Sequence, residues 1–244
     1  MQKFLEHVYT IDHFLSFSSM NDNKLKELLA VVIDHYISKW EPIGSKFLHS
    51  LDDAIYAPST LRKYLNILEK EWLLYQPYHS AWRIPTAQWL SSYIDTLMAL
   101  PEDETTVEID EVHFDLDYAR KDLRSMVETL WEYMDGAVVG FLKEDEYYYL
   151  WLNNLLKENL LGDMETTRYL IKFIEGKEIV QALDSKVMKK WNVYYTVLDT
   201  DEKLIAIVFT KIEINGYDAI IAVLWPARID HKRNILLLKK FIHW

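Results

Sequence analysis

Three segments between residues 41 and 95 limit the fold of this chain more than any others. They contain Glu41-Pro42-Ile43-Gly44-Ser45-Lys46, then Ser59-Thr60-Leu61-Arg62-Lys63, then His79-Ser80-Ala81-Trp82-Arg83-Ile84-Pro85-Thr86. Their surroundings predict a short helix, a longer helix and a loop between two short strands, in that order. This order is typical of a winged helix-turn-helix, which places its second helix in the major groove of DNA.

The segment that follows Ala57-Pro58 has the two opposite faces of an amphipathic helix. The residues expected on its buried face are Leu61, Tyr64, Leu65 and Leu68. The residues expected on its polar face are Ser59, Arg62, Lys63 and Asn66. We expect Ser59 or the adjacent polar group to cap the start of this helix. One face therefore packs in the protein, and the other is free to contact DNA.

The neighbouring segments complete this predicted domain. Apolar residues from Leu25 to Ile37 recur at helical spacing and predict an earlier helix, and Ser45 to His49 indicates a short second one. Two short strands are expected within residues 73–95, and a helix is expected to begin at about Thr86.

The acidic, non-periodic residues 97–117 are expected to be a linker. They would separate a DNA-binding domain at 21–96 from a second domain at 118–244, and residues 1–20 would form an N-terminal extension. The predicted fold class is α+β.

The second domain is expected to combine helices with a largely antiparallel sheet. Helical stripes run from Leu123 to Met134, from Leu170 to Leu183 and over about His231–Ile242, and Tyr147 to Leu152 is strand-like. Asn215-Gly216 lies between two apolar, strand-like runs and is the strongest short signal for a β-hairpin.

The distribution of charge qualifies the DNA-binding prediction. The net charge is −11, but residues 1–95 have 9 Lys and Arg against 11 Asp and Glu, whereas residues 96–244 have 18 against 27. Phosphate binding depends on the local field within a Debye length of about 8–10 Å. A near-neutral first part predicts modest non-specific affinity and specific binding that depends on a homodimer.

Composition also limits the compartment and the chemistry. The chain has no cysteine, which excludes disulfides, thiolate zinc sites and a cysteine nucleophile. No apolar run approaches the roughly 20 residues that span a bilayer, and a signal peptide is not supported, so we expect a cytoplasmic protein without membrane contact. The eight histidines show no metal-ligand spacing, and Ser, His and Asp form no nucleophile motif. We expect no metal, no cofactor and no enzyme activity.

The predicted DNA-binding residues are Ser45, Lys46, Ser59, Thr60, Arg62, Lys63, Asn66, His79, Ser80 and Arg83. Arg62, Lys63 and Asn66 are expected to reach base edges, because arginine pairs with guanine and asparagine with adenine. Phosphate contacts are expected from Ser45, Lys46, Ser59 and Thr60. The loop between the strands, with His79, Ser80 and Arg83, would lie on the minor groove or the phosphates. The alternatives are a solvated helix face, plain N-capping, and a structural arginine paired with an acidic neighbour.

These three segments resemble the family of the heat-inducible transcription repressor HrcA, which has an EPVGS-like segment, an S-x-T-I-R-like helix and an S-x-G-R-x-P-T wing. A distal family motif, G-P-x-R-M-D/N, is matched by Trp225-Pro226-Ala227-Arg228-Ile229-Asp230. The resemblance implies a repressor of heat-shock (chaperone) genes that binds an inverted-repeat operator as a dimer, with the GroE chaperonin as a partner. It also implies a GAF-like second domain. This chain has no room between Met134 and Tyr147 for the dimerising domain that the family inserts, so it would be a short form.

Seven tryptophans fall where the family pattern has glycine: Trp40, Trp72, Trp82, Trp89, Trp151, Trp191 and Trp225. Glycine is only 6 of 244 residues, about a third of the usual roughly 7%. Our hypothesis is that the source organism reads UGA codons as glycine and that they were translated here as tryptophan. The alternative is true tryptophan in core and turn positions.

Two other functions remain open from the sequence. One is a ligand-responsive regulator with a small-molecule pocket in the GAF-like domain. The many aromatic residues permit such a pocket but do not require it. The other is an interaction protein that no longer binds DNA, which the near-neutral first domain suggests.

Overall fold

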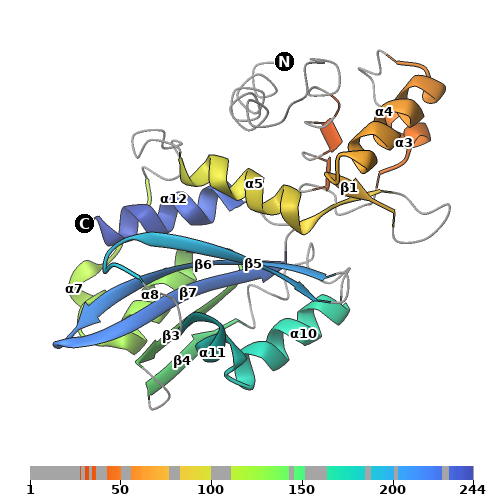
Figure 1. The fold of residues 1–244 in the computed structure, drawn as a ribbon. Coiled ribbons are helices and arrows are strands. Elements are labelled where there is room, and N and C mark those ends of the chain that lie inside the picture. Colours follow the sequence, from red (N-terminus) through yellow and green to blue (C-terminus); the bar gives the residue numbers. More distant parts are fainter. Residues whose placement is uncertain are drawn as a thin grey trace. The chain divides into compact units, whose positions relative to one another are not determined.

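The computed structural model describes residues 28, 31–32, 35–36, 43–50, 56–76, 83–99, 111–142, 146–151, 164–184, 188–200, 203–226 and 231–243. The chain forms two compact units, Met1–Ala99 and Leu100–Trp244. Helices and antiparallel strands occur in both, which confirms the α+β class (Figure 1).

Unit 1 follows the predicted order of a short helix, a longer helix, two short strands and a final helix. Its elements are α3 (Ser45–Ser50), α4 (Pro58–Lys70), β1 (Leu74–Tyr75), β2 (Ile84–Pro85) and α5 (Ala87–Met98). The strands pair antiparallel, with Leu74 opposite Pro85. Of the predicted earlier helix, the described Leu28, Val32 and Tyr36 are helical and buried.

The start of α4 differs from the prediction. The N-cap is Ala57, which makes no side-chain cap, and Pro58 occupies the first turn. Proline suits this position because its missing N–H would have no partner there. Ser59 is therefore not the cap of this helix. At α5 the expected start is confirmed, because the Thr86 hydroxyl accepts a hydrogen bond from the Trp89 N–H at 3.1 Å.

Unit 2 is built on a five-stranded antiparallel sheet in the order β4-β3-β7-β6-β5. Its strands are β3 (Ala137–Leu142), β4 (Glu146–Leu150), β5 (Val193–Thr200), β6 (Lys203–Ile214) and β7 (Tyr217–Pro226). Its helices are α7 (Leu116–Ala119), α8 (Leu123–Tyr133), α10 (Met164–Glu175), α11 (Glu178–Asp184) and α12 (His231–Ile242).

The predicted hairpin is confirmed. Ile214 pairs with Tyr217 across the turn, and Asn215 and Gly216 have φ values of 52° and 82°. Positive φ at both positions is the signature of the type I′ turn, whose twist matches that of the strands.

The central strands of this sheet are covered on both faces. β3, β6 and β7 have consecutive buried residues rather than an alternating pattern, and α8, α10 and α12 all pack on the sheet (Figure 1). α8 lies so close to β3 that a Cβ added at Gly140 would come within 2.6 Å of Val127 Cγ2. Gly140 therefore permits this packing.

Three expectations for unit 2 need correction. The expected linker at 97–117 begins inside α5, and its last residues belong to unit 2, where the Phe114 ring packs edge-on against Tyr133 and Phe241 at 5.2 and 5.1 Å. The single helix expected at 170–183 is two helices, α10 and α11, because Lys177 after Gly176 turns left-handed with φ 57°. Strands β3 and β5 had no counterpart in the prediction.

Candidate nucleic-acid interface

The polar face of α4 is the strongest candidate for contact with DNA. Leu61, Leu65 and Leu68 are buried on one side of the helix. Ser59, Arg62, Lys63 and Asn66 are exposed on the other, at the spacing i, i+3, i+4 and i+7. Within the described part of the chain, Arg62 and Lys63 form no ion pair, so this face presents two cations to solvent.

Helix α3 packs against α4 and adds a further cation. Lys46, in its first turn, is exposed, whereas Ser45 is half-buried. Thr60 is also half-buried, and its backbone N–H donates to the Ala57 carbonyl at 2.9 Å. These hydroxyls are less open to solvent than the lysine. His79 and Ser80 lie outside the described residues.

Arg83 is placed differently from the other predicted contacts. Its residue is only 9% exposed, and its Nε donates to Glu69 Oε2 at 3.2 Å. Its Nη2 donates to Asn66 Oδ1 on the same face of α4. The structure therefore matches the alternative of a structural arginine paired with an acidic neighbour, and these contacts leave the residue largely buried.

The backbone of Arg83 adds a third connection. Its N–H donates to the Ile43 carbonyl at 3.0 Å, and the Ile43 N–H donates back at 2.9 Å. Arg83 thus joins the start of α3, the strand β2 and the exposed face of α4. Glu69, its acidic partner, was missed by the sequence analysis. Its position three residues after Asn66, on the same side of the helix, was the available signal.

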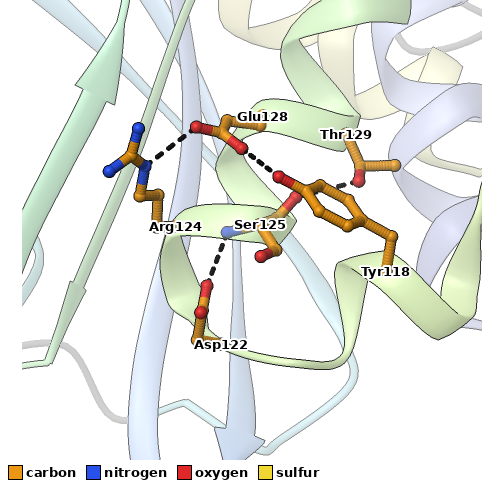
Figure 2. A network of polar contacts seen from close by, with 6 residues as sticks. All are labelled: Tyr118, Asp122, Arg124, Ser125, Glu128 and Thr129. Carbon is orange, nitrogen blue, oxygen red and sulfur yellow. Dashed lines mark hydrogen bonds and ion pairs between the residues drawn. The ribbon is translucent and has the colours of Figure 1, made fainter.

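A polar network in unit 2 joins α7 to α8 (Figure 2). The α7–α8 network consists of Tyr118, Asp122, Arg124, Ser125, Glu128 and Thr129. Glu128 accepts hydrogen bonds from the Tyr118 hydroxyl and from Arg124 Nε, the latter at 2.9 Å. These bonds lower the pKa of Glu128, and the bond to Glu128 raises the pKa of Tyr118. Tyr118, Asp122 and Arg124 are exposed, whereas Ser125 and Thr129 are buried, and the network joins the two helices.

The first turn of α8 is capped within the same network. The Asp122 carboxylate accepts from the Ser125 N–H at 2.7 Å, and this bond lowers the Asp122 pKa. The Thr129 hydroxyl donates to the Ser125 carbonyl at 2.8 Å one turn later. These are interactions of a helix N-terminus.

The start of α12 is fixed to the turn before β3 by residues that the sequence analysis did not single out. Asn234 accepts from the Asp135 N–H at 2.9 Å and donates to the Asp135 carbonyl at 2.7 Å. Arg233 donates to the Tyr133 carbonyl at 2.6 Å. Of the distal motif, Trp225 is buried and its Nε1 donates to His231 Nδ1 at 3.1 Å. Arg228 and Asp230 lie outside the described residues.

The described residues contain no group of three His, Asp or Glu side chains that could bind a metal ion. In the same part of the chain, every helix is too short or too polar to cross a bilayer.

Comparison with curated proteins places these features in a family. HrcA of Alkaliphilus metalliredigens, a heat-inducible transcription repressor, is 30% identical over 178 residues, which cover 70% of this chain and 51% of the relative. HrcA of Ruminiclostridium cellulolyticum is 33% identical over 169 residues, 66% and 45% of the two chains. HrcA of Trichormus variabilis is 37% identical over 84 residues, 34% and 23%. The chain belongs to the HrcA family.

The chain spans about half the length of the HrcA proteins of Alkaliphilus metalliredigens and Ruminiclostridium cellulolyticum. No family model matches it. The crystal structure of a hypothetical protein shares its fold, with a TM-score of 0.61 at 15% identity over 92% of this chain and 99% of that chain.

Proposed function

We propose that this member of the HrcA family is a transcriptional repressor that binds duplex DNA through a winged helix-turn-helix. In this proposal α3 and α4 are the helix pair, α4 lies in the major groove, and β1 and β2 support the wing. The observation that supports it best is the exposed face of α4, where Arg62 and Lys63 have no ion pair with any described residue while the opposite leucines are buried.

The residues of this face would divide the work between bases and phosphates. Arg62 would read a guanine, with Lys63 and Asn66 beside it at base edges. A second set of residues would contact the phosphate backbone and fix the register. That set is Ser45, Lys46, Ser59 and Thr60, with His79 and Ser80 on the wing.

Arg83 would act as a positioning residue in this interface. Its bonds to Glu69 and Asn66 connect the base of the wing to the reading helix, and its backbone bonds add the start of α3. Fixed orientation of the wing against α4 would let both contact one stretch of duplex at the same time.

The proposed targets are heat-shock (chaperone) genes with inverted-repeat operators, bound by a homodimer. Dimerisation would double the phosphate contacts, which a near-neutral reading domain needs. The second unit would be the GAF-like regulatory domain that mediates the dimer. An effect of the GroE chaperonin on repression is part of the same proposal, by analogy with the family.

Selection of duplexes from a random pool by the full chain, followed by a gel-shift titration, tests the proposal. We expect enrichment of an inverted repeat. Arg62→Ala should weaken binding to it by about 1–3 kcal/mol and relax the preference at one base pair in each half-site. The matched control is Lys172→Ala, which removes an exposed lysine from α10 in unit 2 and should leave binding unchanged.

Lys46→Ala gives a second readout of the same interface. Because Lys46 would contact phosphate, its loss should weaken all sequences alike and reduce the dependence on salt. No enriched sequence, or equal effects of Arg62→Ala and Lys172→Ala, would contradict the proposal and favour an interaction protein without DNA binding.

A cavity in unit 2 favours one alternative, a regulator that also responds to a small ligand. It has a volume of about 240 Å³ and is lined by Leu116, Arg120, Met126, Trp191, Phe241 and Ile242. Ligand pockets commonly measure about 300–1,000 Å³, so only a small molecule would fit. A thermal-shift screen of metabolites against the full chain, repeated with Arg120→Ala, would identify such a ligand.

A further inference from the structure

Two tryptophans of this chain occupy backbone conformations that favour glycine. Trp72 has φ 59° and Trp191 has φ 62°, both in the left-handed region. This region costs an L-residue roughly 1–2 kcal/mol, and a bulky residue is a genuine outlier there. From these conformations we infer that the native protein has glycine at positions 72 and 191.

Trp72 occupies the position after a helix where glycine is most strongly preferred. At the end of α4 the Trp72 N–H donates to the Glu69 carbonyl at 3.1 Å, and the Leu73 N–H donates to the Leu68 carbonyl at 3.0 Å. This pair of bonds is the Schellman motif, and the buried Leu68 and Leu73 match the hydrophobic contact that accompanies it. Trp72 is its left-handed residue, which is usually glycine.

The side chain of Trp72 is too exposed for its packing to offset this strain. It is 73% exposed, the largest exposed fraction among the exposed large apolar side chains in the described part of the chain. Its carbonyl accepts a hydrogen bond from the Thr86 hydroxyl at 2.7 Å, but in this bond and in those of the motif position 72 contributes only backbone atoms. Glycine would keep all of them.

Trp191 repeats the backbone conformation in unit 2, just before β5, although its side chain lines the cavity of that unit. Its N–H donates to the Lys211 carbonyl at 2.7 Å, again a bond that glycine can make, and the residue is 42% exposed. Of the other left-handed residues described, Gly136 and Gly216 are glycine already, Asn215 is of a type that tolerates this region, and Lys177 is a long but unbranched residue at the turn between α10 and α11.

Trp89 and Trp225 behave differently. They are buried at 1% and 0% exposure, and the Nε1 of Trp225 donates to His231. At these positions the structure matches true tryptophan, and Trp151 is half-buried. Trp40 and Trp82 lie outside the described residues. The inference from the backbone therefore concerns positions 72 and 191.

Reading of UGA as glycine explains how tryptophan came to stand at these two positions. The cheapest test is the gene itself: UGA at codons 72 and 191 supports the inference, and UGG at either overturns it for that position. Peptide mass spectrometry of the protein from its own organism gives the direct result. Glycine at both positions is expected, and tryptophan overturns the inference.

Chemical unfolding of the full chain supplies an independent measurement. Trp72→Gly should lower the unfolding equilibrium constant of unit 1 about fivefold, because relief of strain outweighs the extra freedom of the unfolded chain. Trp72→Ala retains the Cβ and hence the strain, so it should bring no comparable gain. Equal behaviour of the Gly and Ala variants would overturn the inference.

Trp191→Gly against Trp191→Ala repeats the comparison for unit 2. The matched control is Trp131→Gly, because Trp131 lies inside the right-handed helix α8. Glycine there should destabilise the protein, through lost packing and low helix propensity. A gain in stability at position 131 as well would show that removal of any tryptophan is favourable, and would overturn the inference.

Discussion

The two units use their charged side chains in different ways. In unit 2 several cations lie against acidic partners: Lys190 contacts Glu213 and Asp218 at 2.5 and 2.7 Å, and Arg124 contacts Glu128 at 2.9 Å. In unit 1 the cations of the α4 face have no acidic partner among the described residues. The difference shows why the net charge of −11 is a poor guide to DNA binding. The local arrangement of charge decides which surface can bind phosphate.

The cores of the units differ as well. Unit 2 buries consecutive residues of β3, β6 and β7, whereas α4 of unit 1 buries a single stripe and leaves its other face in solvent. A unit with one buried face per helix has surface available for a ligand of the size of DNA. A sheet covered on both faces serves stability or assembly.

The largest expected effects come from core truncation and test whether the two units unfold separately. Phe209→Ala, at a residue 1% exposed on β6, should cost unit 2 about 3–5 kcal/mol. Leu65→Ala, at a fully buried residue of α4, should cost unit 1 about 2–5 kcal/mol. Denaturant unfolding with hydrogen exchange read separately for each unit gives both values.

Each variant serves as the control for the other. If the units are energetically separate, Phe209→Ala leaves the exchange of α4 amides unchanged, and Leu65→Ala leaves the exchange of β6 amides unchanged. Equal loss of protection in both units after either change would show a single cooperative structure, and the comparison between units would then concern their surfaces alone.

The next effect in size is expected at Arg83, the charged side chain that unit 1 uses internally. Arg83→Met keeps the apolar length of the side chain but removes the two hydrogen bonds that the charged guanidinium donates to Glu69 and Asn66. We expect it to lower the free energy of unfolding by about 1.5–3 kcal/mol. DNA affinity should also fall, with a similar loss for every sequence, because the wing loses its orientation. Specificity for the operator over random duplex should persist.

A double-mutant cycle with Glu69→Gln separates the ion pair from packing. Coupling between the two changes is expected, since Nε and the carboxylate lie 3.2 Å apart. An unchanged specificity ratio with reduced affinity marks a positioning residue. Loss of discrimination at one base pair would instead mark Arg83 as a reader and contradict the assignment.

Periodicity was enough to predict the elements that bury one stripe. The faces of α4, the start of α5, the span of α12 and the Asn215-Gly216 hairpin all depend on local spacing or on a local turn rule. Strand β3 was not predicted, because its sequence lacks such a periodic pattern. Its residues are buried on both faces and lack alternation, so a short apolar run did not reveal whether it was strand or helix.

Long-range pairing also explains the errors at the candidate site. Arg83 and Glu69 are 14 residues apart and meet because β2 pairs with β1, which packs against α4. Asn234 and Asp135, which are joined by hydrogen bonds, are 99 residues apart in the sequence. Rules based on sequence spacing do not predict such long-range contacts. The sequence therefore indicated which charged residues lie on the surface, but not which of them form pairs.

A smaller effect is expected at Asp122, the cap of α8. The folded-state pKa of Asp122 lies below the ordinary value of 3.8, chiefly because of the bond from the Ser125 N–H. A depressed carboxyl pKa gives stability that is fully present above the unfolded pKa and is lost as the pH falls through the folded pKa. Asp122→Ala should therefore cost about 1 kcal/mol at neutral pH and less at an acidic pH below the folded-state pKa. Urea unfolding at both pH values measures the difference.

Asp122→Asn controls for charge in that experiment. Asparagine caps helices about as well as aspartate but does not titrate, so the stability difference between Asp122→Asn and Asp122→Ala should not change with pH. A cost of Asp122→Ala that persists unchanged in acid would show that packing, and not the carboxylate, stabilises the start of α8.

The smallest effect is expected at Lys190, where unit 2 concentrates its paired charges. Lys190 contacts both Glu213 and Asp218, and these acids raise its pKa. All three side chains are substantially exposed, so water and salt screen the attraction, and Lys190→Ala should change stability less than Asp122→Ala does. Thermal unfolding at low and high salt measures the effect, which should shrink as salt rises. If it did not, the paired charges of unit 2 would contribute to its stability as buried groups do. The contrast with Arg62 and Lys63 of α4, which have no ion pair among the described residues, would then extend from arrangement to energy.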